Sequence, residues 1–204
     1  MTPLLIGTWN KGKRRELQQL LSDLPFALMG LDDIPGLELV LETGGTFVEN
    51  ASLKACGYAR QSGLLTLADD SGLEVDALKG APGVLSARYA GEQASDQQRV
   101  EKLLADLSNV AAPGRRARFV SAVATAISNG SILNMSLGMC EGQIAFEPRG
   151  SGGFGYDPVF IPAGYDMTFA ELAPEIKNQI SHRHSALQKA HECLRNLTRD
   201  SAAR

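Results

Sequence analysis

The order of apolar runs along the chain constrains the fold more than any other feature of the sequence. Short apolar runs typical of strands, at residues 3–8 and 64–68, alternate with two expected helices, at 13–24, where apolar residues recur at helical spacing, and at 46–63. Later, Ser-Asn-Gly-Ser at 128–131 lies between two strand-like runs, which is a strong hairpin signal. Alternating elements favour parallel strands and a hairpin needs antiparallel ones. The sequence therefore predicts an α/β protein with a mixed sheet.

Helix and strand limits can be predicted from local signals. Thr46 with Glu49, and Ser95 with Gln98, form capping-box pairs that should each begin a helix, and the first of these helices should end near Gly63. The remaining expected elements are strands at 118–127, 132–139 and 159–161 and a helix at 185–197. No linker or repeat interrupts residues 1–204, so we expect a single domain.

Composition limits the possible partners and compartments. A formal net charge of −3 gives no reason to expect a general nucleic-acid-binding surface. The three cysteines are odd in number and widely spaced, which is typical of reduced thiols in the cytoplasm. The first apolar run is too short for a signal peptide or a membrane span. We therefore expect a cytoplasmic protein that binds neither nucleic acid nor membrane.

A basic loop, GTWNKGKRRE, joins the first predicted strand to the first helix. Backbone N–H groups at a helix start favour anions, and Lys11, Lys13 and two arginines add positive charge there. The loop is thus either a solvated helix start or a phosphate site. Gly7, Gly12 and Lys13 also fit the P-loop spacing, but Arg14 stands where a P-loop needs a Ser or Thr hydroxyl for magnesium.

Carboxylates end two apolar runs beside glycines. Asp69 and Asp70 follow residues 64–68, and Glu42 precedes Gly-Gly. Successive side chains of a strand point to opposite faces, so only one aspartate should face a ligand. Magnesium takes one or two carboxylates and completes its octahedron with water and phosphate, which Glu42 and one aspartate would satisfy. The alternative is that these side chains are exposed turn residues or helix caps.

Two later segments could bind a nucleoside. The loop RGSGGFGYDP carries Phe154 and Tyr156, which could stack on a base or belong to the core. KNQISHRHSAL offers Lys177, His182 and Arg183 as donors to a base edge or a phosphate. The histidines include no His-Glu-x-x-His motif, and we expect no structural zinc.

Five blocks, in this order, give the chain a resemblance to the inosine triphosphate pyrophosphatase (Ham1) family: TWNKGKRREL, ETGGTFVENASLKA, LADDSGLEVDALKGAPGVLSARYAG, GGFGYDPVF and SHRHSAL. The resemblance implies an elongated mixed sheet flanked by helices, with two lobes around a central substrate cleft, as in Ham1/Maf-like folds. It also implies a homodimer that hydrolyses non-canonical purine nucleoside triphosphates (ITP, dITP and XTP) to the monophosphate and pyrophosphate, keeping them out of DNA and RNA.

Roles for individual residues follow from the same resemblance. It makes Glu42 and Asp70 ligands of Mg²⁺, with Asp70 also the catalytic base, while Asp69 turns away to brace the loop. The implied substrate contacts are Thr8, Asn10, Lys11, Gly12, Lys13, Ser71, Phe154, Gly155, Tyr156, Asp157, Lys177, His182 and Arg183. The chain departs from the family at Trp9, which is usually Gly, and we expect Trp9→Gly to be tolerated. His184 also stands where bacterial members often have Gly.

Two other functions fit parts of the sequence. A P-loop-like NTPase would release orthophosphate, since LLTLADD also resembles the acidic strand of that class. A non-catalytic nucleotide-binding module would bind without turnover. The missing hydroxyl after Lys13 counts against the first, and the acidic residues count against the second.

Overall fold

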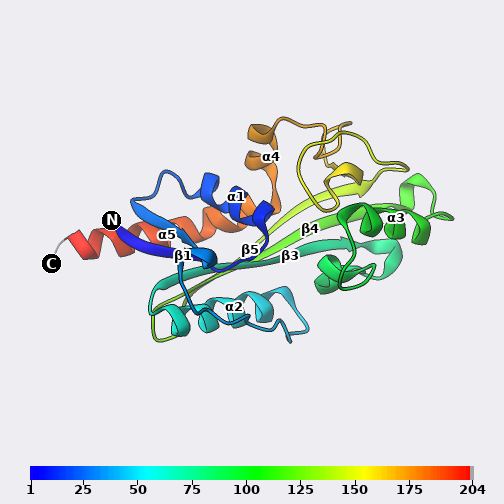
Figure 1. The fold of residues 1–204 in the computed structure, drawn as a ribbon. Helices are drawn as coiled ribbons and strands as arrows, with labels where there is room; N and C mark the ends of the chain where they lie inside the picture. The colour runs from blue at the N-terminus through cyan, green and yellow to red at the C-terminus, as the bar shows by residue number, and fades with distance from the viewer. Residues whose placement is uncertain (203–204) are drawn as a thin grey trace. The chain divides into compact units, whose positions relative to one another are not determined.

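The fold is a mixed α/β arrangement built on one six-stranded sheet (Figure 1). The structure is a computed structural model that describes residues 1–202. The elements are β1 (Thr2–Ile6), α1 (Lys11–Leu20), β2 (Phe26–Gly30), α2 (Phe47–Ser62), β3 (Leu65–Val75), α3 (Asp96–Asp106), β4 (Arg116–Ala126), β5 (Ile132–Ile144), β6 (Phe160–Pro162), α4 (Pro174–Ile180) and α5 (His182–Ala202).

The strand order β2-β1-β3-β4-β5-β6 confirms a mixed sheet. β1 is parallel to both β2 and β3, whereas β5 is antiparallel to β6. The chain reverses between β4 and β5 through residues 127–131, where Ile127 N donates to the carbonyl of Ser131 at 3.0 Å. The predicted hairpin is therefore present. Strand β4 is offset from the predicted range 118–127, and β5 is longer than the predicted range 132–139.

The chain divides into two compact units. Unit 1 comprises Met1–Asp70, Ser121–Gly138 and Arg183–Arg204, and unit 2 comprises Ser71–Val120 and Met139–His182. Strands β3, β4 and β5 each contribute residues to both units.

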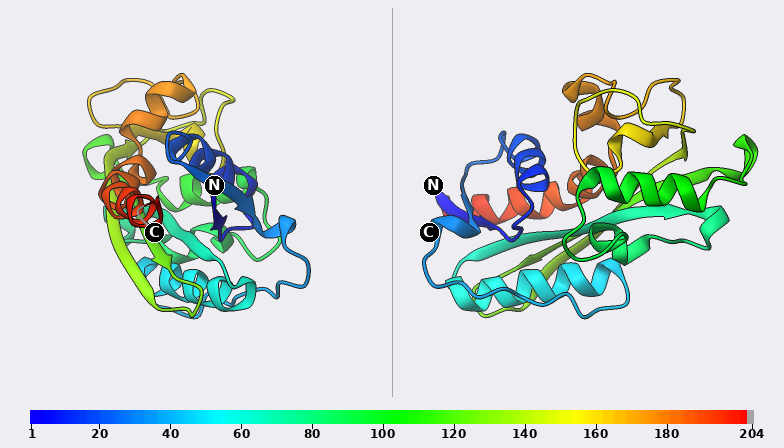
Figure 2. Two further views of the ribbon diagram at one scale, coloured as in Figure 1. Left: turned by 90° about the vertical axis from the view of Figure 1, so that its left-hand side faces the viewer. Right: turned by 45° about the vertical axis from the view of Figure 1, so that its right-hand side comes forward.

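Unit 1 has a core on each face of its strands. Leu4 and Ile6 of β1 pack with α1 and α5, whereas Leu5 between them packs with Tyr58 of α2. This alternation is the period-2 pattern of a strand buried on both sides. Both views of Figure 2 accordingly keep α2 on the opposite side of the strands from α1 and α5.

Unit 2 has its own core. Leu73 and Val75 of β3 pack with Val100 and Leu103 of α3, and Phe160 begins β6 in the same cluster. The helix face formed by Val100 and Leu103 is the one that the sequence spacing predicts. Among residues 1–202, no helix combines the length and apolar character needed to cross a membrane.

The predicted helix caps are confirmed. The hydroxyl of Thr46 accepts a hydrogen bond from Glu49 N, and the Glu49 carboxylate accepts one from Thr46 N. Ser95 and Gln98 make the same pair of bonds at the start of α3. Helix α2 ends at Gly63, which has φ = +70°, a left-handed conformation that favours glycine.

The predicted end of β3 is wrong. The strand does not stop at the acidic pair but continues to Val75, so Asp69 and Asp70 lie in its middle. Ser71 and Gly72 permit a turn but do not force one. β1 pairs with β3 only as far as Leu67, so β4 is the neighbour that offers backbone partners to the rest of the strand, and extension is favoured.

The run before Glu42 is also not a strand. Residues 37–44 have no regular secondary structure, and Leu39 and Leu41 are 65% and 68% exposed. The end of the segment is instead held against α2, where the N–H groups of Gly44 and Gly45 donate to the side chains of Asn50 and Glu49. Sequence reasoning also did not identify β2 and α4, and it placed α1 two residues too late at its start.

Candidate active site

The loop after β1 is built as a helix N-terminus with oriented polar groups. Gly7 N donates to the carbonyl of Leu67 at 2.7 Å, which continues the pairing of β1 with β3. Asn10 is the N-cap of α1, and its Oδ1 accepts from Lys13 N at 3.0 Å. Thr8 Oγ1 accepts from Asn10 N at 3.3 Å. The loop thus presents the first turn of α1, whose dipole favours an anion.

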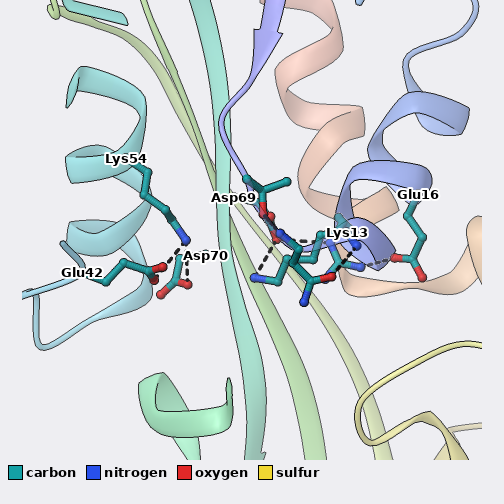
Figure 3. A network of polar contacts seen from close by, with 9 residues as sticks. Lys13, Glu16, Glu42, Lys54, Asp69 and Asp70 are labelled. Carbon is teal, nitrogen blue, oxygen red and sulfur yellow. Dashed lines mark hydrogen bonds and ion pairs between the residues drawn. The ribbon is translucent and has the colours of Figure 1, made fainter. Parts of the chain in front are cut away.

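Asp69 lies on the α1 and α5 side of β3 and links these two helices (Figure 3). The carboxylate is fully buried, with Oδ2 at 3.5 Å from Lys13 Nζ and 3.2 Å from Arg183 Nε. Arg183 also pairs with Glu16 of α1. We call Lys13, Glu16, Asp69 and Arg183 the Asp69 cluster. Its geometry confirms that Asp69 turns away from Asp70 and braces the loop.

Asp70 points to the other side of β3, where it meets α2 (Figure 3). Lys54 of α2 holds two carboxylates, with Nζ at 3.1 Å from Asp70 Oδ1 and 3.0 Å from Glu42 Oε2. Oδ2 of Asp70 is buried and receives no hydrogen bond from any described residue. We call Glu42, Lys54 and Asp70 the Asp70 cluster. Within the described chain no group of three or more His, Cys, Asp or Glu gathers as a metal cage.

The segment that carries Glu42 is held against α2 by close backbone contacts. Asn50 Oδ1 accepts from Gly44 N at 2.8 Å, and Glu49 accepts from Gly45 N at 2.7 Å. A Cβ atom on Gly44 would lie 2.5 Å from the Cβ of Glu49, so only glycine allows this approach.

The two carboxyl groups of the Asp70 cluster differ in the direction of their pKa shifts. Burial raises the pKa of Asp70 to about 6 against the attraction of Lys54 and Lys13, and the nearby Glu42 carboxylate adds to the increase. Burial also acts against ionisation of Glu42, but Lys54 and the hydrogen bond with Asp70 hold its pKa below the usual value. Burial lowers the pKa of Lys13, whereas the surrounding carboxylates raise the pKa of Lys54 despite its burial. Of the pair, Asp70 is the carboxyl that takes up a proton near neutral pH.

Unit 2 contains a second cluster of predicted site residues. Asp157 pairs with Lys177 of α4, and its Oδ2 accepts from Phe154 N at 2.8 Å. The ammonium of Lys177 lies 5.0 Å from the centre of the Phe154 ring. We call Phe154, Asp157 and Lys177 the Lys177 cluster. It combines a half-buried aromatic ring with a buried cation held over that ring.

The neighbouring predicted residues of unit 2 differ in exposure and role. Gly155 N donates to Asp96 Oδ2 at 2.7 Å, which joins the glycine loop to α3. His182 is buried and stacks on Phe119 with ring centres 4.7 Å apart. Tyr156 is a core residue whose hydroxyl donates to the carbonyl of Ser86 at 2.9 Å. Its side chain therefore belongs to the core, one of the two readings that the sequence left open.

Sequence reasoning missed two polar residues of these clusters, Lys54 and Glu16, and also Asp96, which accepts from Gly155 N. The buried positions of α2 include Asn50, Ala51, Lys54 and Ala55, so Lys54 falls on the apolar stripe of an amphipathic helix. A lysine on such a stripe needs a partner, and this signal was available in the sequence. Glu16 and Asp96 gave no comparable signal.

Together, the fold and the clusters define an α/β protein in which a helix start whose dipole favours an anion accompanies a carboxylate pair. The comparisons with known proteins refine this class. The model of the Ham1 family matches residues 4–193. A dITP/XTP pyrophosphatase of Desulforamulus reducens is 50% identical over 95% of this chain and 96% of its own length. One from Geobacter sulfurreducens is 49% identical over 92% of this chain and 94% of its own length.

Solved structures agree with this relationship. A HAM1 protein from Coxiella burnetii superposes with a TM-score of 0.85 at 42% identity, covering 95% of this chain and 98% of that one. The Ham1 protein of Staphylococcus aureus gives 0.83 at 39% identity, covering 96% and 99%. The chain belongs to the Ham1 family.

Proposed function

We propose that the clusters described above perform the reaction stated in the names of the relatives. The chain hydrolyses dITP and XTP, which are non-canonical purine nucleoside triphosphates, and releases the monophosphate and pyrophosphate. We add ITP to these substrates because the sequence resembles the inosine triphosphate pyrophosphatase family. Removal of these nucleotides would keep them out of DNA and RNA. Relatives named dITP/XTP pyrophosphatase match nearly the whole chain at 43–50% identity.

The Asp70 cluster is the observation that carries this proposal. A single strand directs Asp69 to the helix that begins with the basic loop and Asp70 to Glu42 and Lys54. Folding alone gives no reason to bury an acidic pair there, because an ionised carboxylate loses several kcal/mol of hydration on burial. A role in binding and hydrolysing a phosphoanhydride would explain why these carboxylates are buried.

Glu42 and Asp70 fit Mg²⁺ as its two protein ligands. Magnesium binds one or two carboxylates and keeps water and substrate phosphates in its other positions, so a larger cage is not needed. The buried Oδ2 of Asp70, which no described donor contacts, supports this assignment. When bound, Mg²⁺ would neutralise charge on the phosphate oxygens and on the departing pyrophosphate.

The residues of the chain have separate tasks in this proposal. Asp70 orients the attacking water and accepts its proton, for which a pKa of about 6 is suited to neutral pH. Lys54 keeps the two carboxylates together. Lys13 and the amides of the first turn of α1 bind phosphate oxygens, with Thr8, Asn10, Lys11 and Gly12 shaping that turn.

We assign the nucleoside to the residues of unit 2. Phe154 would stack on the base, and Lys177 and His182 would donate hydrogen bonds to its edge, with Gly155, Tyr156 and Asp157 fixing the loop. Ser71, which follows Asp70, would contact the phosphates. Arg183 remains a proposed substrate contact, although its guanidinium also holds Asp69 and Glu16. The substrate cleft and the single-domain organisation stay predictions.

A homodimer in the cytoplasm completes the proposal. Leu133, Leu137 and Met139 alternate along β5 and are 39%, 40% and 54% exposed, so one face of this strand carries an apolar stripe. A second copy of the chain would cover such a stripe. Cys56, Cys140 and Cys193 are all free, as expected for a reducing compartment.

Product analysis tests the proposed activity. Purified protein with Mg²⁺ is assayed on dITP, XTP, ITP, dGTP and dATP, and pyrophosphate and orthophosphate are measured separately. We expect pyrophosphate, with dITP and XTP turned over far more efficiently than dATP. A 6-keto purine offers an acceptor where adenine has an amino group, and each unpaired buried donor would lose about 1–3 kcal/mol. Orthophosphate would support the P-loop-like alternative, and binding without turnover would support the non-catalytic one.

A further inference from the structure

Trp9, the only tryptophan of the chain, lies in the basic loop between Thr8 and Asn10. Its side chain is 50% exposed, so burial does not fix the position of the indole. One hydrogen bond does: Nε1 donates to the hydroxyl of Tyr58 at 2.9 Å. The bond joins two residues that are 49 positions apart in the sequence.

Tyr58 connects this bond to the Asp70 cluster. The tyrosine is buried in α2 one turn after Lys54, with 1% of its surface exposed. Its hydroxyl also receives a longer hydrogen bond, at 3.4 Å, from the backbone N–H of Val40, two residues before Glu42. A single hydroxyl therefore touches the basic loop and the segment that carries Glu42, from the helix that carries Lys54.

We infer that Trp9 is a positioning residue that couples the basic loop to the Glu42 segment through Tyr58. This inference rests on the proposed function, since it concerns phosphate binding by the loop and cation binding by Glu42. A shift of the loop on an anion moves the indole, and the shared hydroxyl carries that shift to Val40. Coupling between two binding sites is reciprocal, so a cation at Glu42 also favours the anion-bound loop.

The inference revises the expectation for glycine at position 9. A glycine would leave the loop without its bond to α2, and the Tyr58 hydroxyl would keep only the longer bond from Val40 N. The loop would keep its N-cap at Asn10. Glycine substitution should therefore weaken the response of one site to the other and leave the fold of α1 intact.

Two conservative variants and one matched control test the coupling. Trp9→Phe removes the indole N–H and keeps a ring, and Tyr58→Phe removes only the hydroxyl. Tyr165→Phe makes the same change on a partly buried tyrosine of unit 2 and is the control. Each protein is titrated with pyrophosphate at low and at high Mg²⁺, and turnover of dITP is measured. The emission of Trp9 reports binding directly in the parent, in Tyr58→Phe and in Tyr165→Phe.

We expect saturating pyrophosphate with Mg²⁺ to change Trp9 emission in the parent and in Tyr165→Phe. In the parent, Mg²⁺ should tighten pyrophosphate binding. In Trp9→Phe and Tyr58→Phe this gain should shrink by about three- to tenfold, the effect of one neutral hydrogen bond, while kcat at saturation changes less than about twofold. The double variant should lose no more than Tyr58→Phe alone, because Tyr58→Phe already breaks the bond that Trp9→Phe removes.

Three results would each overturn the inference. The first is a gain in pyrophosphate affinity with Mg²⁺ that is unchanged in both variants, and the second is a double variant whose loss is the sum of the single losses. The third is Trp9 emission in the parent that does not change with pyrophosphate and Mg²⁺. These outcomes differ from failure of the proposed function. If the parent bound pyrophosphate with coupled emission but released none from dITP, the coupling would stand and the activity would not.

Discussion

The Asp70 cluster and the Lys177 cluster both bury a lysine beside carboxylate groups, but their balance of charge differs. In the Lys177 cluster one carboxylate faces one ammonium and also accepts a backbone N–H, so the pair is satisfied from within. In the Asp70 cluster one ammonium serves two carboxylates, and the pKa of Asp70 rises to about 6 because it is buried. The first arrangement is suited to hold a shape, and the second to accept a cation or a proton.

This difference suggests that the Asp70 cluster of unit 1 handles phosphates and the Lys177 cluster of unit 2 handles the nucleoside. Pyrophosphate has phosphate groups but no nucleoside, so its binding reports on phosphate binding alone. Substitutions in unit 1 should change pyrophosphate binding or the chemical step. Substitutions at the Lys177 cluster should change only the binding of whole nucleotides.

The largest effect is expected for Asp70→Asn. The amide keeps the shape of the side chain but can neither accept the proton of water nor offer a charged ligand, so kcat for dITP should fall about 10³-fold. Circular dichroism and the melting temperature should show a folded protein. Asp69→Asn is the informative comparison. It removes the charge that holds Lys13 and Arg183, so it should lower stability more than Asp70→Asn does. Parent-like turnover by Asp70→Asn would remove Asp70 from the mechanism.

Lys13→Ala should have the next largest effect. Loss of a charged contact to phosphate should lower kcat/KM for dITP by about 30-fold and weaken inhibition by pyrophosphate to a similar extent. Arg15→Ala, on the exposed face of the same helix, is the control and should change both values by less than about twofold. Loss of nucleotide binding with unchanged pyrophosphate inhibition would contradict the assignment of phosphates to unit 1.

A smaller effect, in the opposite unit, is expected for Phe154→Leu. Loss of the ring removes stacking on the base, and KM for dITP should rise about tenfold while inhibition by pyrophosphate stays the same. Phe146→Leu is a matched control, because Phe146 is also a ring beside a cation, 4.1 Å from Arg115, but no site role is proposed for it. A parallel loss of pyrophosphate binding in Phe154→Leu would break the division of tasks.

The sequence predicted the starts of α2 and α3 because these depend on local signals. The capping pairs at Thr46 and Ser95 are complete within four residues, and each was found in place. The opposite directions of Asp69 and Asp70 follow from the period of a strand, and the structure confirms them.

What the sequence did not predict depends on contacts between distant segments. The continuation of β3 past Asp70 depends on its neighbour β4, because β1 pairs with β3 only as far as Leu67, and local residues do not specify that neighbour. Lys54 reaches Asp70 from 16 positions away, and Trp9 reaches Tyr58 from 49. The pKa of Asp70 likewise depends on burial, which the assembled fold creates.

The smallest effect we predict is the pH dependence of cation binding by the Asp70 cluster. The pKa of Asp70 is raised to about 6, so the group is protonated and neutral below that pH and ionised above it. Only the ionised form binds Mg²⁺, so affinity should increase with pH through 6 and level off above about 7. Between pH 7.5 and 6 affinity should fall about twofold, because half of the Asp70 groups carry a proton at their pKa, and by pH 5 about tenfold. The rise in melting temperature caused by Mg²⁺ measures this affinity. In Asp70→Asn that rise should be small at every pH, and an equal pH dependence in the variant would assign the titration to another group.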